Sequence, residues 1–152
     1  ENSSILTVDS NGKITGVSEG VAAIHAKVDG VKSNSIDFEV RSSNLRRGTF
    51  VKAGGYEASG STNLEFNSGK LTLKLESNFS TSFALGTYIY LANSTNASAV
   101  RSAGLEISQI SANGAHTFDV LAINNAVKLN TYKYVVILCK PATVTFGFAE
   151  LK

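Results

Sequence analysis

The chain has a single cysteine, Cys139, and a single proline, Pro141, two positions later. A thiol acts as a nucleophile, a metal ligand or a redox group only as the thiolate, and it therefore needs access to its partner. With one cysteine in the sequence, the chain forms no intrachain disulfide. The chemistry open to this protein therefore depends on which way Cys139 faces.

The direction of Cys139 follows from the length of the loop that contains Pro141. The stretch from Tyr134 to Leu151 is the most apolar in the sequence and predicts two strands joined by a short loop. A loop of two or four residues sets Cys139 opposite Val144, on the most apolar face, and Ile137 opposite Phe146. A loop of three residues instead sets Cys139 beside small and polar residues.

The residues around Pro141 favour a four-residue loop. Lys140 precedes the proline and so resists the helical conformation that a three-residue loop needs, and Ala142 would need a positive φ there. Proline also fits the primed two-residue turns poorly, because its φ is fixed negative. A four-residue loop buries Cys139 and directs Lys140 to the opposite face of the strand. A buried, inert thiol and an accessible, reactive thiol both remain open.

Other residues could also form a site. Five tyrosines could line a face that binds sugars or peptides, Tyr88 and Tyr90 foremost, although strand aromatics more often form core or cross-strand pairs. The full set is Tyr56, Tyr88, Tyr90, Tyr132 and Tyr134. His25 and His116 fall in different blocks of the chain, so we expect structural or surface roles for both and no metal site.

Composition excludes several functional classes. Apolar residues make up 43% of the chain and charged residues 17%, which is typical of a folded protein with a core. The net charge is +2, and Arg46-Arg47 is the one adjacent basic pair, so we expect no nucleic-acid partner. No run approaches the roughly 18 apolar residues of a membrane span, so no transmembrane segment is expected.

Short alternating runs predict an all-β protein. In the block after residue 45, Leu71, Leu73 and Leu75 alternate with polar residues and should point inward. Further strands are expected over 64–66, 70–76, 87–92, 104–110, 116–121, 134–139 and 144–151, with a loop that carries two phenylalanines at 78–85 and a polar loop at 93–98. No segment shows helical periodicity, and a single helical turn is expected at 124–128. Strands of this length and spacing favour an antiparallel β-sandwich or barrel.

The first block contains a hairpin whose register can be predicted. A three-residue loop, Ser10 to Gly12, sets Val8 opposite Ile14 and Asp9 opposite Lys13, and glycine suits the left-handed position in such loops. Further strands are expected over 21–28 and 36–40, the second half-buried. The polar stretch 41–47 predicts a linker, with a domain boundary near residue 45.

The second block resembles the electron-transfer DM domain, number thirteen in its series. The resemblance is carried by Gly48-Thr49-Phe50, Tyr90-Leu91-Ala92 and, most specifically, Val135-Val136-Ile137-Leu138-Cys139-Lys140 followed by Phe146-Gly147-Phe148-Ala149-Glu150-Leu151. The family usually has Gly-Pro-Asp where this chain has Ala84-Leu85-Gly86. The resemblance implies a β-sandwich and a redox role centred on Cys139.

The first block resembles the C-terminal half of a group-two bacterial immunoglobulin-like domain. The matching strings are Val8-Asp9-Ser10-Asn11-Gly12-Lys13-Ile14-Thr15-Gly16-Val17 and Glu19-Gly20-Val21-Ala22-Ala23-Ile24-His25-Ala26. We therefore expect a partial immunoglobulin-like domain over 1–44, without its opening strands, and an antiparallel β-sandwich domain over 45–152.

These resemblances imply a bacterial module outside the cytoplasm, at the cell surface or in the periplasm. The first hypothesis is a redox or electron-transfer module without enzymatic activity or bound cofactor, which uses Cys139 and meets a redox partner protein. The alternative is an adhesion module with an inert cysteine that binds a cell-surface glycan or a protein through loops or exposed tyrosines.

Overall fold

The computed structural model describes residues 4–40 and 44–152. The chain divides into two compact units, residues 1–43 and 44–152. The first unit holds β1 (Leu6–Val8), β2 (Ile14–Gly16), β3 (Gly20–Ile24), β4 (Lys27–Val28), β5 (Val31–Lys32) and β6 (Ile36–Val40). The identity of this unit as part of an immunoglobulin-like domain stays a prediction.

The β1–β2 hairpin has the predicted register. Val8 lies opposite Ile14, and the backbone N–H of Asp9 donates to the carbonyl of Lys13. The Asp9 carboxylate accepts from the backbone N–H groups of Asn11 and Lys13, both at 2.9 Å. Gly12 has a φ of +80°, the left-handed conformation that the loop requires. Turn chemistry therefore determines this hairpin locally.

One expectation for the first unit was wrong, and another was confirmed only in part. The strand expected over 21–28 is broken into β3 and β4. The β6 strand pairs with β3 as an antiparallel ribbon, but Ile36 is 64% exposed, so the apolar side of β6 is only partly covered. Alternation showed which residues share a face, but burial also needs a second layer over that face.

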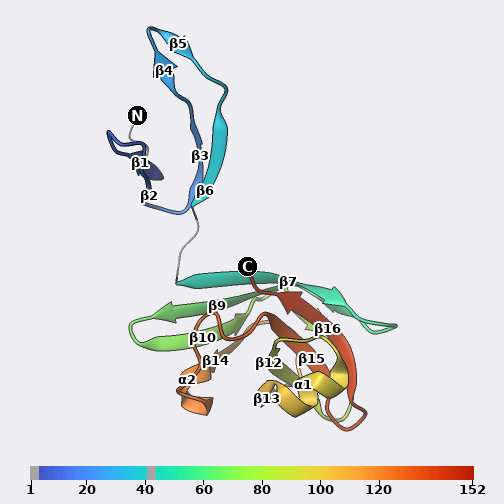
Figure 1. The fold of residues 1–152 in the computed structure, drawn as a ribbon. Helices are drawn as coiled ribbons and strands as arrows, with labels where there is room; N and C mark the ends of the chain where they lie inside the picture. Colours follow the sequence, from blue (N-terminus) through green and yellow to red (C-terminus); the bar gives the residue numbers. More distant parts are fainter. Residues whose placement is uncertain (1–3, 41–43) are drawn as a thin grey trace. The chain divides into compact units, whose positions relative to one another are not determined.

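The second unit carries most of the structure. Its elements are β7 (Leu45–Lys52), β8 (Ala58–Ser59), β9 (Ser61–Asn67), β10 (Lys70–Leu75), β11 (Ser80–Thr81), β12 (Thr87–Ala92), α1 (Ala97–Ala103), β13 (Leu105–Gln109), β14 (His116–Asp119), α2 (Val120–Ile123), β15 (Tyr134–Cys139) and β16 (Val144–Glu150). Eight strands form one antiparallel sheet in the order β13-β12-β15-β16-β7-β9-β10-β14, so the all-β prediction is confirmed (Figure 1).

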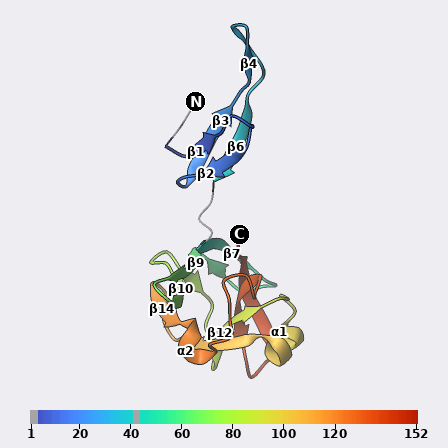
Figure 2. The same cartoon turned by 60° about the vertical axis from the view of Figure 1, so that its left-hand side comes forward.

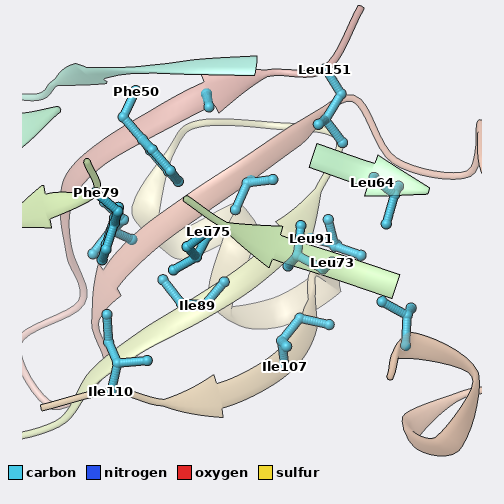
Figure 3. Close-up of a cluster of buried hydrophobic side chains, with 14 of the residues drawn as sticks. Phe50, Leu64, Leu73, Leu75, Phe79, Ile89, Leu91, Ile107, Ile110 and Leu151 are labelled. Carbon is cyan, nitrogen blue, oxygen red and sulfur yellow. The ribbon is translucent and has the colours of Figure 1, made fainter. Parts of the chain in front are cut away.

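The core lies on the inner face of this curved sheet. Side chains from β9 and β10 meet side chains from β12 and β13 in one apolar cluster, so the two ends of the sheet face each other across the core (Figures 2 and 3). Leu71, Leu73 and Leu75 are buried as predicted. Ser68 and Gly69, both at positive φ, form the two-residue turn between β9 and β10.

Three further expectations for the second unit were wrong. The expected linker reaches into the sheet, because β7 begins at Leu45; residues 41–43 lie outside the described part. A charged residue fits at position 46 of β7 because the Arg46 guanidinium donates hydrogen bonds to the backbone carbonyls of Tyr132 and Leu151. The chain also has helices at α1 and α2, whereas 124–128 forms no helix.

The helix N-caps account for these two helices. Asn96 accepts from the backbone N–H groups of Ser98 and Ala99 at the start of α1. Asp119 accepts from Leu121 and Ala122 at the start of α2, and so ends β14 before the strand reaches the predicted residue 121. Both are residues that favour N-cap positions. Each helix buries a single side chain, so the apolar spacing gave no helical signal.

We predict that Leu73→Ala lowers the free energy of unfolding of the second unit by about 2–5 kcal/mol, because it leaves a cavity where the side chain is fully buried. Urea denaturation followed by circular dichroism measures this change. The control is Lys74→Ala on the same strand, whose side chain is 45% exposed and should cost about 0.5 kcal/mol or less. Equal losses in the two variants would contradict the assignment of the inner face.

Candidate functional site

Cys139 is the last residue of β15 and faces the core. Four residues, 140–143, join β15 to β16, and Cys139 lies opposite Val144, as predicted from the residues around Pro141. The side chain of Cys139 is 5% exposed and belongs to the main apolar cluster. Thr143 takes the positive φ, +52°, that closes the loop. Cys139 is therefore a buried thiol at one end of the core.

The β15–β16 pairing differs from the prediction beyond Cys139. Ile137 was expected opposite Phe146, but it lies opposite Gly147, while Leu138 lies opposite Thr145. Phe146 is thus an extra residue on β16, which is the pattern of a β-bulge. A Cβ on Gly147 would come within 2.2 Å of the Ala58 Cβ, so the sheet has room there for glycine alone.

The thiol lies beneath the loop that precedes β12. The Sγ of Cys139 is 4.0 Å from the carbonyl oxygen of Leu85. The backbone N–H of Lys140 donates to the carbonyl of Gly86 at 2.9 Å, which holds this loop to the end of β15. Leu85 itself is 93% exposed. The backbone of Leu85 therefore lies against the thiol, while the Leu85 side chain buries almost no surface.

Gly86 determines how closely the covering loop packs. It has a φ of +86°, and a Cβ at this position would come within 2.7 Å of the Pro141 Cδ. The pyrrolidine ring of Pro141 thus rests against the backbone of Gly86. Pro141 favours an even number of residues in the β15–β16 loop. It also packs against the other loop, before β12, that covers Cys139.

Lys140 lies on the opposite face of β15, as expected. Its Nζ is 2.7 Å from a carboxylate oxygen of Glu106 and 4.9 Å from the ring centroid of Tyr88. The same Glu106 oxygen accepts a hydrogen bond from the hydroxyl of Tyr90. This network lies on the outer face of the sheet, so Lys140 does not act on the thiol.

The network shifts the pKa of two of its members. Burial and the hydrogen bond to Glu106 raise the pKa of Tyr90 well above its ordinary value. For Glu106, burial alone would raise the pKa, but hydrogen bonds from Lys140 and Tyr90 and the Lys140 charge outweigh it, so the pKa lies below its ordinary value. The carboxylate stays ionised and the phenol stays neutral near pH 7.

The two tyrosines named as binding residues have different environments. Tyr90 is 2% exposed and packs in the cluster of the outer face, so its ring is not accessible for stacking against a ligand. Tyr88 is half-buried and donates to the side chain of Gln109. Tyr56 is 38% exposed and stacks on Phe146, with ring centroids 4.4 Å apart.

The histidines lie in different units. The ring of His116 stacks against Phe118, and its Nε2 lies 2.9 Å from the carbonyl of Ala112. His25 is half-buried after the end of β3. Among residues 4–40 and 44–152, no three His, Cys, Asp or Glu side chains gather in a way that could hold a metal ion.

Sequence reasoning missed Glu106 and Leu85 as parts of this region. Glu106 meets Tyr90 because a register shift between Ile89 and Tyr90 interrupts the β12–β13 ladder. Such a bulge leaves no pattern in a single sequence. Leu85 had a visible signal, because an isolated leucine before a glycine stands where the family usually has a proline.

Within the described ranges, no helix is long and apolar enough to cross a membrane.

The second unit is a curved antiparallel β-domain with a single thiol under an edge loop. The family model of electron transfer DM13 matches residues 50–151, and the chain belongs to that family. The matched range includes Cys139 and both strands of the β15–β16 hairpin. No curated protein matched the chain, and no solved structure matched it either.

We predict that the Glu106 network makes the free energy of unfolding depend on pH in the acid range. A carboxyl group with a lower pKa in the folded state stabilises the fold above its unfolded pKa, about 4.3 for Glu, and this contribution is lost as the pH falls through the folded value. Urea unfolding should show Glu106→Gln less stable than wild type at pH 7. The difference should narrow as the pH falls below about 4. A difference that stays constant over this range would contradict the network.

Proposed function

We propose that this chain is a redox module that exchanges oxidising equivalents with a partner protein through the thiol of Cys139. One observation carries the proposal. The electron transfer DM13 match includes Cys139, and the covering layer over this thiol is a loop whose most prominent side chain, Leu85, is 93% exposed. Opening that loop would expose the thiol with little loss of apolar burial.

Thiol–disulfide exchange is the chemistry that suits a single cysteine. The Cys139 thiol loses its proton to solvent, and the thiolate attacks one sulfur of a partner disulfide. A new S–S bond forms to Cys139 as the partner S–S bond breaks, and the departing sulfur takes the electron pair as a thiolate. The mixed disulfide is the oxidised form of the module. A thiolate of a second protein then attacks the partner's sulfur in the mixed disulfide, so that Cys139 leaves as a thiolate and the oxidising equivalents pass to a disulfide between the two proteins.

The position of the thiol makes the covering loop the control point. An incoming sulfur must reach the Sγ of Cys139, which in the closed form is buried and lies 4.0 Å from the carbonyl oxygen of Leu85. The loop is held by the Lys140–Gly86 hydrogen bond and by the contact between Gly86 and Pro141. Local opening of such a segment costs less than global unfolding, because few buried contacts are broken.

We further propose that the module works outside the cytoplasm of a bacterium, at the cell surface or in the periplasm. Disulfide partners persist in oxidising compartments, whereas cytosolic thiols are kept reduced. The partner in this proposal is a protein with an accessible disulfide.

The experiment incubates the folded full chain with glutathione disulfide and follows the product by mass spectrometry. We predict that wild type gains one glutathione at Cys139 without denaturant and that Cys139→Ser gains none. Modification that requires denaturant would overturn the proposal.

A pair of glycine variants tests the role of the loop. Gly86→Ala strains a positive φ and collides with Pro141, so it should displace the loop and speed glutathione addition several-fold. Gly69→Ala strains a similar φ, +79°, in the β9–β10 turn, where a Cβ would meet nothing within 4 Å. Equal rates in the two variants would contradict the loop as the control point.

A further inference from the structure

Tyr90 is a buried phenol that the proposed thiol chemistry does not use. It lies on the outer face of β12, is 2% exposed, and packs in one cluster with Val100 of α1 (Figure 2). Its hydroxyl donates to a carboxylate oxygen of Glu106 at 2.5 Å, a length typical of a charge-assisted bond. The Nζ of Lys140, 2.7 Å from the same oxygen, holds the carboxylate in place. Tyr90 therefore has a proton acceptor fixed at its hydroxyl group and almost no contact with solvent.

The composition limits where this chain can lose a single electron. The sequence has no tryptophan and no methionine, so its five tyrosines and Cys139 are the side chains most easily oxidised. A phenol that loses an electron becomes a strong acid, and it therefore needs a base within hydrogen-bond reach. All five tyrosines lie in the described part of the chain, and Tyr90 alone among them donates to a carboxylate.

Three tyrosines form a row on the outer face of the sheet. Tyr88 and Tyr90 are two residues apart on β12, or about 7 Å at the rise of a strand. Tyr134 is the diagonal neighbour of Tyr90, because Tyr90 lies opposite Val136 and Ala92 lies opposite Tyr134. The three rings pack in the same cluster, and Tyr88 and Tyr134 are half-buried. An electron can therefore pass between the buried ring of Tyr90 and the surface through either neighbour.

Neighbouring charges favour Tyr90 over Tyr88 as the place where the electron is lost. The Nζ of Lys140 is 4.9 Å from the ring centroid of Tyr88, and a cation there opposes removal of an electron from that ring. The Tyr88 hydroxyl donates to the side chain of Gln109, which is neutral and a poor base. Glu106 can instead take the proton of Tyr90, so that oxidised Tyr90 ends as a neutral group.

We propose that Tyr90 is a one-electron redox site, at which an electron leaves through Tyr88 or Tyr134 while the phenol proton moves to Glu106. The electron goes to a high-potential one-electron oxidant, such as an oxidised metal centre on a partner protein. The products are the neutral Tyr90 phenoxyl radical, protonated Glu106 and the reduced oxidant. A one-electron reductant of the phenol class returns the electron, and the proton moves back from Glu106 to the Tyr90 oxygen.

Burial suits this role. Two exposed phenoxyl radicals that meet form a covalent bond between their rings, which ends the reaction irreversibly. The ring of Tyr90 is 2% exposed, so a radical there does not meet a second one. The site can therefore be oxidised and reduced repeatedly, as electron transfer requires.

The test oxidises the folded full chain with ruthenium(III) tris-bipyridine, which a light flash generates in the presence of a sacrificial electron acceptor. The phenoxyl radical is followed by its transient absorption and, after freeze-quenching, by electron paramagnetic resonance. We predict a long-lived tyrosyl signal in wild type. Absence of a tyrosyl signal would overturn the proposal.

A pair of phenylalanine variants tests the location. Tyr90→Phe keeps the ring in the outer cluster but removes the hydroxyl group, and it should reduce the yield of the long-lived radical several-fold. Tyr132→Phe makes the same change at a half-buried tyrosine that packs on the inner face, and it should leave the yield unchanged. An unchanged yield in Tyr90→Phe, or equal losses in the two variants, would overturn the assignment to Tyr90.

A second pair tests the proton acceptor. Glu106→Gln keeps a hydrogen-bond acceptor beside Tyr90 but removes the base, so it should slow radical formation at least about tenfold, since a positioned base contributes that much or more. Glu65→Gln removes a carboxylate that pairs with Lys74 at 3.6 Å and touches no tyrosine, and it should not change the rate. Heavy water should slow radical formation in wild type, because the proton moves with the electron. A Glu106→Gln variant that forms the radical as fast as wild type would contradict the role of Glu106.

The tyrosine site stands apart from the proposed thiol chemistry. Cys139→Ser should form the same radical as wild type, because the thiol lies on the inner face of the sheet. Loss of the radical in this variant, with folding intact by circular dichroism, would show that the thiol is the group oxidised and would overturn the proposal. Failure of wild type to react with glutathione disulfide would leave the prediction for Tyr90 unchanged.

Discussion

The β15–β16 hairpin occupies the middle of the eight-stranded sheet, and each of its side chains lies on one of two faces. Four residues in its loop align Cys139 with Val144 and direct both toward the core. The neighbouring Lys140 is thereby directed outward, where it pairs with Glu106. A loop one residue shorter would exchange the two faces, because side chains alternate along a strand. Whether the loop has an even or an odd number of residues therefore determines which face of the sheet the thiol lies on.

The two faces of the sheet have different physical characters. The inner face is filled by apolar side chains from β9, β10, β12 and β13 (Figure 3). Cys139, the last residue of β15, belongs to the same cluster. Part of the outer face is covered by α1 and by the cluster around Tyr90. The part over β16, β7 and β9 stays open as a groove. One sheet thus has a covered thiol on its inner face and an open groove on its outer face.

The sequence was sufficient where local chemistry decides the structure. Pro141 and its neighbours disfavoured a three-residue loop, Gly12 favoured the three-residue loop of the first hairpin, and alternating leucines identified the inner face of β10. It was insufficient where a residue depends on a distant partner. The bulge at Phe146 and the meeting of Glu106 with Tyr90 depend on how strands from separate segments come into register. Arg46 was read as linker because its carbonyl partners lie more than 80 residues away.

The candidate site was predictable in part for the same reason. The burial of Cys139 followed from the even number of residues in the loop between β15 and β16. The covering loop around Leu85, in contrast, could not be placed over the thiol without the β12–β15 register. The groove was invisible to sequence reasoning, because Arg47 lies in β7, Asn63 in β9 and Lys152 after the end of β16, and these segments are adjacent only in the folded structure. Each of the three reads, by itself, as an ordinary polar residue.

The most direct test of this account compares the rate of maleimide labelling at Cys139 with the rate of global unfolding of the same chain in the absence of denaturant. If the Ala84–Gly86 loop is the cover, labelling proceeds through local opening and is faster than unfolding. A labelling rate equal to the unfolding rate, with the same dependence on urea, would show that the thiol is reached through unfolding alone and would contradict a redox role for Cys139.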